Sequence, residues 1–471
     1  MHLQFCGAAG EVTGSCSKLD VEHSSILIDC GLFQGDRFAS EKNFDPFPFK
    51  PEDIDAVILT HAHLDHCGRL PKLINQGFAG KIYATDATRD LTVLILLDAA
   101  HLMGDEAERN GHPPLYTEED VVHTMERFMP LPYDKEIKIA TGVTATFHNA
   151  GHVLGSSFIE VKGEGKSLIF SGDIGNHPVP LLEAPEDLPQ ADGIILESTY
   201  GDRTHGHYDE GIAALEEAIK GTIRDKGVLL IPAFSLERTQ ELIRMIDEMI
   251  TDHRIPAISA YLDGPLGIKI SRVYEKYEDL FNEETKELEA REPDHSVLTF
   301  KSLTITETAE QSKMINDVDP PKLIIAGSGM MQGGRILHHL KRYLPLESTR
   351  VFVAGFQVQG SLGRRLLDGD RTVTIHGEQV VVNAKILGTQ AFSSHMDKTQ
   401  LVEWLRTMKH LPKAVFLNHG DDEARAAFSK QLREELGIKK VLVPNYGDGY
   451  TITDEEDDAR LEYEEETTQA A

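Results

Sequence analysis

The chain has 471 residues and a formal net charge of −30, with 40% hydrophobic residues. This length exceeds that of one ordinary domain and predicts two, and the acidic balance argues against a broad nucleic-acid-binding surface, which usually carries a basic face. No stretch approaches the roughly 20 apolar residues that span a bilayer, and the N-terminus lacks a secretory signal pattern, so we expect a cytoplasmic protein without a membrane partner.

Two compositional features are not expected to form functional sites. The four cysteines form no CxxC pair, and we interpret them as reduced core thiols. Acidic clusters at residues 454–458 and 464–466 are interpreted as a solvated tail. Because the chain carries a large net negative charge, a bound polyanion would need a local site where metal ions supply much of the positive charge.

Short apolar runs along the chain end in residues that can bind a metal ion. Such runs are typical of strands covered on both faces in α/β layers. A single Asp or His after a strand is more often a cap or a turn former, but several of them predict ligands that meet at one edge of a sheet. The runs are Ser25–Ile28 before Asp29, Ala56–Leu59 before a histidine cluster, Ser167–Phe170 before Asp173, Gly193–Leu196 before Glu197, and Ala414–Leu417 before His419.

The histidine cluster is the most informative of these segments. It reads HAHLDH, and it comprises His61, His63, Asp65 and His66. An extended segment with alternating histidines directs two imidazoles the same way, and the following turn can direct Asp65 and His66 to a second position. A mixed nitrogen and oxygen set without thiolate suits zinc best, with manganese or iron as alternatives. Helices are predicted over 65–76, ending at Gly77, and over 86–103.

The sequence pattern changes between residue 208 and residue 382. Apolar runs there precede small-residue loops and helices, which predicts a parallel, Rossmann-like sheet inserted into the metal-binding domain. Ligands of such sheets bind at the carboxyl edge of the strands, and we expect the active site in the cleft between the two domains. The glycine-rich loops are either tight turns or a phosphate-binding surface, with Arg364 close by in the sequence.

The candidate ligands suggest a two-metal hydrolytic centre. One metal ion would be held by His61, His63 and His152, and the other by Asp65, His66 and His419, with Asp173 bridging both. Two such ions activate water at neutral pH and stabilise charge in a phosphoryl displacement. Catalysis is assigned to His395, Glu197 and Asp65: His395 would protonate the leaving oxygen while Glu197 holds its other nitrogen. Alternatively, Glu197 is a strand-end cap and His395 makes a loop hydrogen bond; Asp29 would support ligands without binding metal.

These residues resemble those of a known family. HAHLDH with Asp29, His152 and Asp173 resembles the metallo-β-lactamase fold. Glu197 in ESTYGDR, His395 in FSSHMD and His419 in LNHGD resemble the three motifs of its β-CASP branch, which includes the endonuclease of mRNA 3′-end cleavage and compact bacterial ribonucleases. The resemblance covers nearly the whole chain, and it is closest to the compact bacterial enzymes because the chain is short after His419.

The resemblance implies an α/β fold, in which a metallo-β-lactamase αββα sandwich (1–207 and 383–471, with the acidic tail) carries an inserted Rossmann-like β-CASP domain (208–382). It also implies two Zn²⁺ per chain, with Mn²⁺ as an alternative, and single-stranded RNA as the substrate of endonucleolytic cleavage that can extend to 5′-3′ exonucleolytic trimming. It allows a homodimer. The loops that resemble phosphate-contacting loops of the family carry Ser328, Gly329, Gln357 and Ser361.

Two hypotheses from other classes remain open. One is a small-molecule hydrolase of the same fold, against which the long insertion argues, because a small substrate needs no such addition. The other is a non-catalytic assembly subunit, which would be marked by degenerate ligands, and none of the ligands is missing. Assays with nitrocefin or a glutathione thioester test the first hypothesis, and metal analysis tests the second.

Overall fold

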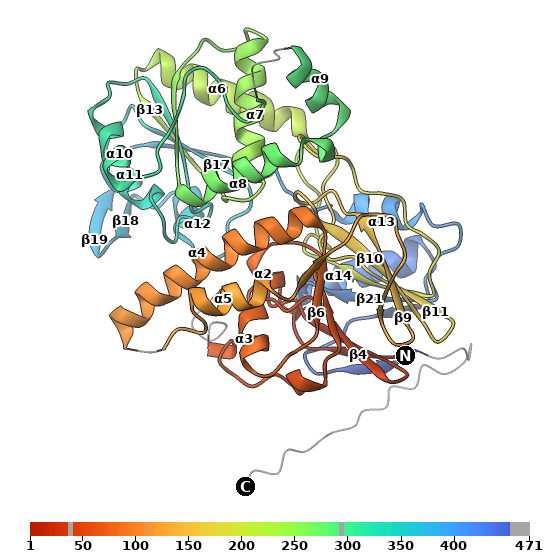
Figure 1. The fold of residues 1–471 in the computed structure, drawn as a ribbon. Coiled ribbons are helices and arrows are strands. Elements are labelled where there is room, and N and C mark those ends of the chain that lie inside the picture. Colours follow the sequence, from red (N-terminus) through yellow and green to blue (C-terminus); the bar gives the residue numbers. More distant parts are fainter. Residues whose placement is uncertain (36–40, 112, 292–295, 453–471) are drawn as a thin grey trace. The chain divides into compact units, whose positions relative to one another are not determined.

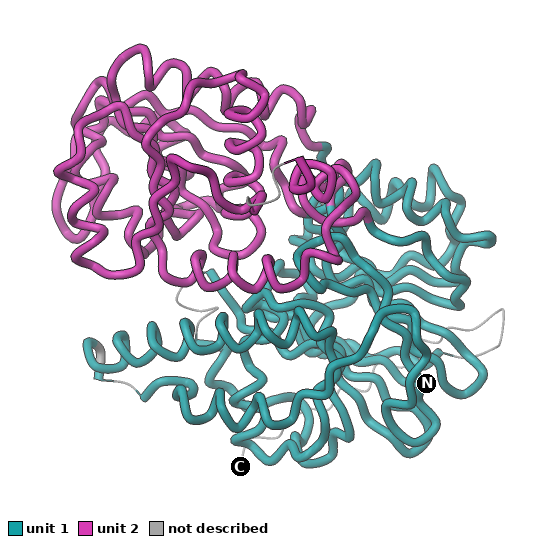
Figure 2. Tube along the Cα trace, turned by 45° about the horizontal axis from the view of Figure 1, so that its top comes forward, with its two compact units in different colours: residues 1–175, 185–204, 395–471 teal, residues 176–184, 205–394 magenta. Residues whose placement is uncertain are grey.

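The computed structural model describes residues 1–35, 41–111, 113–291 and 296–452. The predicted acidic tail at 454–458 and 464–466 therefore lies outside the described residues. The chain divides into two units (Figure 2): unit 1 comprises residues 1–175, 185–204 and 395–471, and unit 2 comprises residues 176–184 and 205–394.

Unit 1 is built around two seven-stranded sheets. Their strand orders are β24-β1-β3-β4-β5-β6-β7 and β23-β21-β12-β11-β10-β9-β8. The first sheet contains β1 (His2–Phe5), β3 (Ser17–Val21), β4 (Ser24–Ile28), β5 (Ala56–Ile58), β6 (Lys81–Ala84), β7 (Phe128–Pro130) and β24 (Gly449–Thr451). The second contains β8 (Ile137–Ala140), β9 (Val143–Asn149), β10 (Ser157–Gly163), β11 (Lys166–Phe170), β12 (Gly193–Glu197), β21 (Ala414–Asn418) and β23 (Lys440–Leu442). A short parallel pair joins β2 (Ala9–Gly10) to β22 (Gly420–Asp421).

Alternation along the strands produces three apolar layers in unit 1. Ile26 and Ile28 of β4 belong to a cluster shared with Phe147 and Ile159 of the second sheet, whereas Leu27 belongs to a cluster under the helices of the first sheet. Helices thus cover the outer face of each sheet (Figure 1), which confirms the predicted αββα sandwich. The helices of unit 1 are η1 (Pro51–Asp53), α2 (Leu64–Cys67), α3 (Leu70–Asn75), α4 (Asp86–Asn110), α5 (Glu118–Met125), α13 (Lys398–Leu405) and α14 (Asp422–Glu435).

Two helices of unit 1 differ from their predicted bounds. The single helix predicted over 65–76 is divided into α2 and α3, because Pro71 lies in the first turn of α3 and supplies no N–H to a preceding turn. The helix predicted to end at residue 103 continues to the end of α4. It stops where Gly111 adopts the left-handed conformation with φ of 74° and donates its N–H to the Ala107 carbonyl, a common helix C-cap.

Unit 2 contains a six-stranded parallel sheet in the order β15-β14-β16-β13-β17-β20. Along β13, Leu229 and Ile231 pack in the cluster that includes α6 and α7, whereas Val228 and Leu230 pack in the cluster that includes α11. This helix-sheet-helix layering confirms the predicted Rossmann-like domain. The strands are β13 (Val228–Pro232), β14 (Ser259–Asp263), β15 (Leu303–Ile305), β16 (Lys322–Ala326), β17 (Arg350–Ala354) and β20 (Lys385–Thr389), with a hairpin of β18 (Thr372–Ile375) and β19 (Glu378–Val381). The helices are α6 (Tyr208–Arg224), α7 (Arg238–Thr251), α8 (Pro265–Lys276), η2 (Glu278–Leu280), α9 (Glu283–Arg291), α10 (Ala309–Met314), η3 (Ile315–Asp317), α11 (Ile336–Tyr343) and α12 (Leu362–Leu367).

The bounds of unit 2 differ from the predicted insertion at 208–382. At the C-terminal side, β20 pairs in parallel with β17 and adds an edge strand to the sheet, which moves the end of the unit to residue 394. At the N-terminal side, residues 176–184 also belong to unit 2, and within this unit the Asn282 side chain donates a hydrogen bond of 2.9 Å to the Val179 carbonyl.

Two predictions from composition concern the cysteines and the absence of a membrane-spanning helix. All four cysteines are buried and none forms a disulfide, as predicted. Among the described residues, no helix has both the length and the apolar character needed to cross a membrane.

Candidate metal centre

Most candidate ligands of unit 1 lie at the carboxyl ends of parallel strands, whereas His152 follows β9, which pairs antiparallel with both of its neighbours. In the first sheet, Asp29 follows β4 and the histidine cluster follows β5, and these two strands are parallel neighbours. In the second sheet, Asp173 follows β11, Glu197 ends β12 and His419 follows β21, again in parallel strands. Parallel pairing brings these ends to the same edge of each sheet, so residues far apart in the sequence meet.

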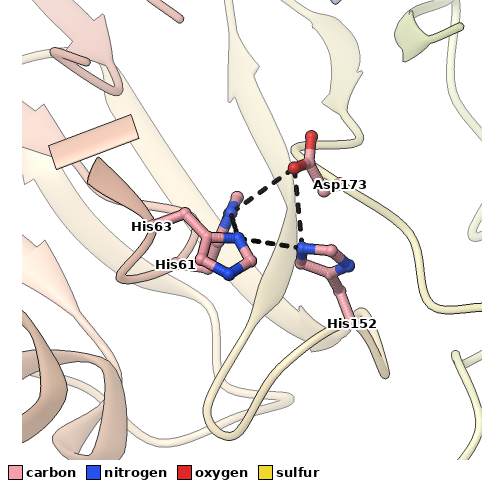
Figure 3. Close-up of side chains that lie close together, drawn as sticks. All are labelled: His61, His63, His152 and Asp173. Carbon is pink, nitrogen blue, oxygen red and sulfur yellow. Dashed lines mark hydrogen bonds and ion pairs between the residues drawn. The ribbon is translucent and has the colours of Figure 1, made fainter. Parts of the chain in front are cut away.

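The first group consists of His61, His63, His152 and Asp173 (Figure 3). His63 Nδ1 lies 3.1 Å from His61 Nε2 and 3.1 Å from His152 Nε2. Asp173 Oδ2 lies 3.5 Å from His61 Nε2 and 3.6 Å from His152 Nε2. Three imidazole nitrogens and one carboxylate oxygen therefore surround one position.

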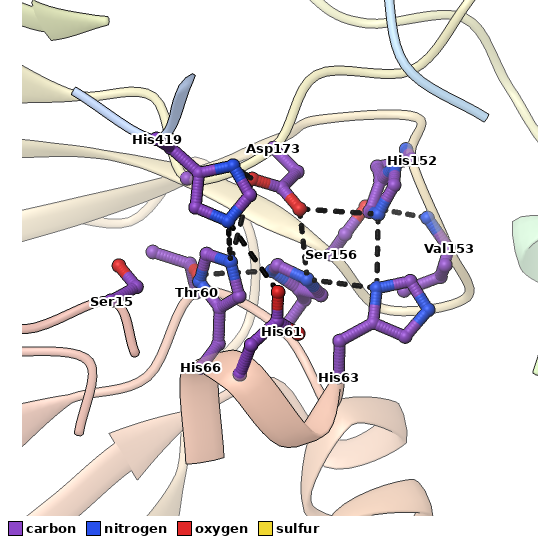
Figure 4. Close-up of polar contacts among 12 residues, drawn as sticks. Ser15, Thr60, His61, His63, His66, His152, Val153, Ser156, Asp173 and His419 are labelled. Carbon is purple, nitrogen blue, oxygen red and sulfur yellow. Dashed lines mark hydrogen bonds and ion pairs between the residues drawn. The ribbon is translucent and has the colours of Figure 1, made fainter. Parts of the chain in front are cut away.

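The second group consists of Asp65, His66 and His419, and Figure 4 shows His66 and His419 beside the first group. His419 Nε2 lies 3.2 Å from His66 Nε2 and 3.5 Å from Asp65 Oδ2. The other carboxylate oxygen of Asp173, Oδ1, lies 3.4 Å from His66 Nε2. Asp173 thus faces both groups with different oxygens, which is the arrangement expected of a bridging ligand.

The spacing of these atoms fits divalent metal ions. Ligand nitrogens at 2.0–2.1 Å from a tetrahedral zinc ion lie about 3.3 Å from one another, close to the 3.1 Å and 3.2 Å observed between facing nitrogens. Two facing imidazole nitrogens can share only one proton between them. In addition, the buried Asp173 Oδ1 accepts no hydrogen bond from any described residue, so a cation would satisfy an oxygen that the protein leaves unsatisfied.

Electrostatics also prepare the side chains of the first group for metal binding. Burial lowers the pKa of His63 to about 4 and holds the pKa of His61 well below its ordinary value, so both imidazoles are neutral at pH 7. Burial disfavours the ionised form of Asp173, but the imidazoles of His419 and His66 outweigh this effect and hold its pKa well below the usual range. Neutral imidazoles and an ionised carboxylate are the forms that coordinate metal ions.

Asp29 contacts one candidate ligand, His66, directly and a second, His61, through Thr60. His66 Nδ1 donates to Asp29 Oδ2 at 2.7 Å, which leaves Nε2 directed at the second group. Thr60 donates its backbone N–H to Asp29 Oδ1 at 2.8 Å, and its hydroxyl lies 3.1 Å from His61 Nδ1. Such partners fix the tautomer and orientation of a ligating imidazole.

Two supporting residues were missed by sequence reasoning. Besides Thr60, the hydroxyl of Thr199 lies 3.1 Å from His419 Nδ1 and so directs Nε2 toward His66. The only sequence signal for either threonine is its position beside a motif residue, since Thr60 precedes His61 and Thr199 lies within ESTYGDR.

Glu197 and His395 form a pair beside the first group. His395 Nδ1 lies 3.1 Å from Glu197 Oε2, and the His395 and His152 rings are 4.6 Å apart. Burial lowers the pKa of His395, but the charges of Glu197 and Asp173 outweigh it and raise the pKa to about 9. Glu197 Oε1 also accepts the backbone N–H of Ile174 at 2.6 Å, which ties the pair to the segment that carries Asp173. The pair can therefore hold a proton on His395 at neutral pH.

The predicted phosphate-contacting residues lie in unit 2. The Gln357 side chain donates to the Gly329 carbonyl at 3.1 Å, so the loops after β16 and β17 are connected. Ser328 Oγ accepts backbone N–H groups within its own loop, and Ser361 Oγ caps α12 by accepting the N–H of Arg364. The Arg364 guanidinium forms an ion pair with Asp368 at 2.6 Å. Ser328, Gly329 and Gln357 thus share one edge of the sheet, whereas the charge of Arg364 is paired with that of Asp368.

A further group, Asp134, His148 and Glu186, was not predicted from the sequence. His148 Nδ1 lies 3.1 Å from Asp134 Oδ1 and 3.3 Å from Glu186 Oε2. These residues come from separate segments without a shared motif. With one imidazole and an exposed aspartate, the group offers fewer imidazole ligands than either group of the candidate centre.

Comparisons with known proteins agree with this architecture. Residues 18–180 match the model of a metallo-beta-lactamase superfamily domain, residues 239–366 that of the Beta-Casp domain, and residues 379–444 that of the Zn-dependent metallo-hydrolase RNA specificity domain. A solved structure of a protein of unknown function from Enterococcus faecalis V583 covers 95% of this chain and 99% of its own, with a TM-score of 0.56 and 11% identity. At this identity, the likeness supports the fold alone.

Curated relatives are similar over nearly the whole chain. Ribonuclease TTHA0252 of Thermus thermophilus is 37% identical over 454 residues, which cover 96% of this chain and 100% of that protein. Transcription termination factor FttA of Methanocaldococcus jannaschii is 32% identical over 459 residues, which cover 94% of this chain and 70% of that protein.

Proposed function

This chain belongs to the β-CASP branch of the metallo-β-lactamase superfamily, and we propose that it is a metal-dependent ribonuclease that hydrolyses phosphodiester bonds of single-stranded RNA. The observation that carries the proposal is the bridging position of Asp173 between two groups of imidazoles, beside the Glu197–His395 pair. The named activity of the 37% identical relative, a ribonuclease, and the match to an RNA specificity domain support RNA as the substrate.

The superfamily uses divalent metal, typically zinc, and we assign two zinc ions to this chain, with manganese as the alternative. His61, His63 and His152 would hold one ion, and Asp65, His66 and His419 the other, with Asp173 shared. When bound, such ions supply Lewis acidity toward water and the phosphoryl oxygens. Because of the net charge of −30, their positive charge would also help to hold a polyanionic substrate.

The protein's own residues supply proton transfer and orientation. His395, protonated at neutral pH, would give a proton to the ribose oxygen that leaves when the P–O bond breaks. Glu197 holds Nδ1 of that imidazole, which makes Nε2 the donor toward the leaving group. Asp29, Thr60 and Thr199 contact the Nδ1 atoms of His66, His61 and His419 and would hold these imidazoles in the tautomers that the two groups need.

Chelation tests the proposed activity directly. Purified protein with zinc is expected to cut single-stranded RNA, and cutting should stop in a chelator and return when zinc or manganese is added back. End-labelled RNA with free or blocked 5′ ends distinguishes internal cleavage from 5′-3′ trimming, because blocking abolishes only the trimming. A metal-replete protein that leaves RNA intact but hydrolyses nitrocefin or a glutathione thioester would replace this proposal with a small-molecule hydrolase. A metal-free, inactive preparation would favour the non-catalytic subunit.

Glu197→Gln tests the role of the pair through the pH dependence of cleavage. An acid must be protonated to act, so activity is expected to fall as the pH rises through the pKa of His395. The substitution removes a carboxylate that raises this pKa, and the alkaline limb should move down by at least about one pH unit. Measurement of kcat from pH 6 to 10 checks this. An unchanged limb would show that Glu197 acts only as a strand-end residue.

Two further assignments belong to the proposal. We place the protein in the cytoplasm, in line with its free cysteines, and we retain the homodimer as a prediction that light scattering of purified protein can test.

A further inference from the structure

Three loops follow neighbouring strands at the carboxyl edge of the unit 2 sheet. The strand β13 lies between β16 and β17 in this sheet, and β13 and β17 can be located in Figure 1. The loop after β13 contains Phe234, the loop after β16 contains Ser328 and Gly329, and the loop after β17 contains Phe356 and Gln357. The loop with Phe234 is therefore the central one.

Phe234 and Phe356 are exposed although the strands before them are buried. All residues of β13 and β17 are buried, whereas the Phe234 side chain is 47% exposed and that of Phe356 is 38% exposed. An aromatic ring that is half exposed to water retains apolar surface that a ligand can cover. Two such rings follow adjacent strands, at the edge where parallel sheets bind their ligands.

The ring of Phe234 is held in place by its neighbours. A Cβ atom added to Gly329 would lie 2.7 Å from Phe234 Cδ2, so the ring packs directly against that glycine. The Phe234 carbonyl accepts the backbone N–H of Thr239 at 3.2 Å and its hydroxyl at 2.7 Å, which ties the loop to the first turn of α7. A ring fixed in this way loses little conformational entropy when a ligand covers its exposed surface.

We propose that Phe234 is a stacking platform for a nucleobase of single-stranded RNA. This inference rests on the proposed function and names a binding residue for its substrate. Bases stack on aromatic side chains irrespective of sequence, and only unpaired bases can do so. The site would thus favour single strands without reading their sequence.

An abasic scan tests the platform. A set of otherwise identical RNA oligonucleotides, each lacking one base, is bound to the zinc-depleted full chain and measured by fluorescence anisotropy. In the parent protein, one position is expected to weaken binding by roughly five- to a hundredfold when its base is absent. In Phe234→Ala, intact RNA should bind more weakly by a similar factor, and the loss at that one position should disappear while other positions behave as in the parent.

Matched variants separate stacking from loss of structure. Phe234→Tyr keeps the ring and should bind as the parent does, whereas Phe234→Leu keeps apolar volume without the ring and should resemble Phe234→Ala. Phe44→Ala removes another exposed phenylalanine, 57% exposed in unit 1, and should leave the scan unchanged.

The outcomes distinguish this inference from the proposed function. If the parent cuts and binds RNA but Phe234→Ala shows the same scan, the stacking platform is wrong and the ribonuclease proposal stands. If Phe234→Leu binds RNA as well as the parent does, the residue contributes packing and the platform is again wrong. If the parent neither binds nor cuts RNA, both proposals fall.

Discussion

Asp173→Asn is expected to remove most of the bound zinc and to lower RNA cleavage by at least about a thousandfold, because charge stabilisation by metal ions is worth several kcal/mol. The two oxygens of this carboxylate face different groups, with Oδ2 at 3.5 Å from His61 and Oδ1 at 3.4 Å from His66. An amide has nearly the same shape but no charge, and its nitrogen does not coordinate a metal ion. One substitution should therefore weaken both positions together.

Metal analysis of the purified variant, followed by cleavage of labelled RNA, checks this expectation. The matched control is Asp134→Asn, because Asp134 also lies beside a histidine in unit 1 but belongs to neither group of the candidate centre. The control should keep two zinc ions and full activity. Zinc content and cleavage at parental levels in Asp173→Asn would exclude a bridging role and, with it, the two-metal assignment.

The sequence could predict the site because its ligands follow strands. The patterns around Asp29, His61, Asp173, Glu197 and His419 each placed a metal-capable residue after a buried apolar run. Parallel strands share a carboxyl edge, so it was sufficient to recognise the strands without knowing their order. The structure brings together all the residues predicted to form the two groups and the acid pair.

Features that depend on three-dimensional neighbours could not be read in this way. Thr60 and Thr199 matter through their distance to an imidazole, and a threonine beside a motif has no pattern of its own. The strand β20 was missed because a short edge strand, exposed along much of its length, is recognised only by its partner β17. Pro71 is a sequence signal for the break between α2 and α3, but the apolar periodicity continues across it and favoured a single helix.

His395→Ala is expected to lower kcat for RNA by about 10²- to 10⁴-fold, the usual contribution of a general acid, while the zinc content stays unchanged. The imidazole lies 4.0 Å from Asp173 Oδ2, farther than the members of the two ligand groups, and its Nδ1 is engaged by Glu197. In the proposed mechanism its proton would therefore serve the leaving group, and His395 would not hold a metal ion. Steady-state cleavage and metal analysis of the same preparation check both parts of the expectation.

The leaving group provides a sharper test of the same residue. A ribose alkoxide is a poor leaving group and needs a proton as the P–O bond breaks, whereas p-nitrophenolate leaves without one. His395→Ala should therefore lose far more activity on RNA than on bis(p-nitrophenyl) phosphate, and Asp173→Asn should lose activity on both substrates. Equal losses on the two substrates would assign His395 to metal or substrate binding, because a residue that donates no proton has no reason to distinguish between the two leaving groups.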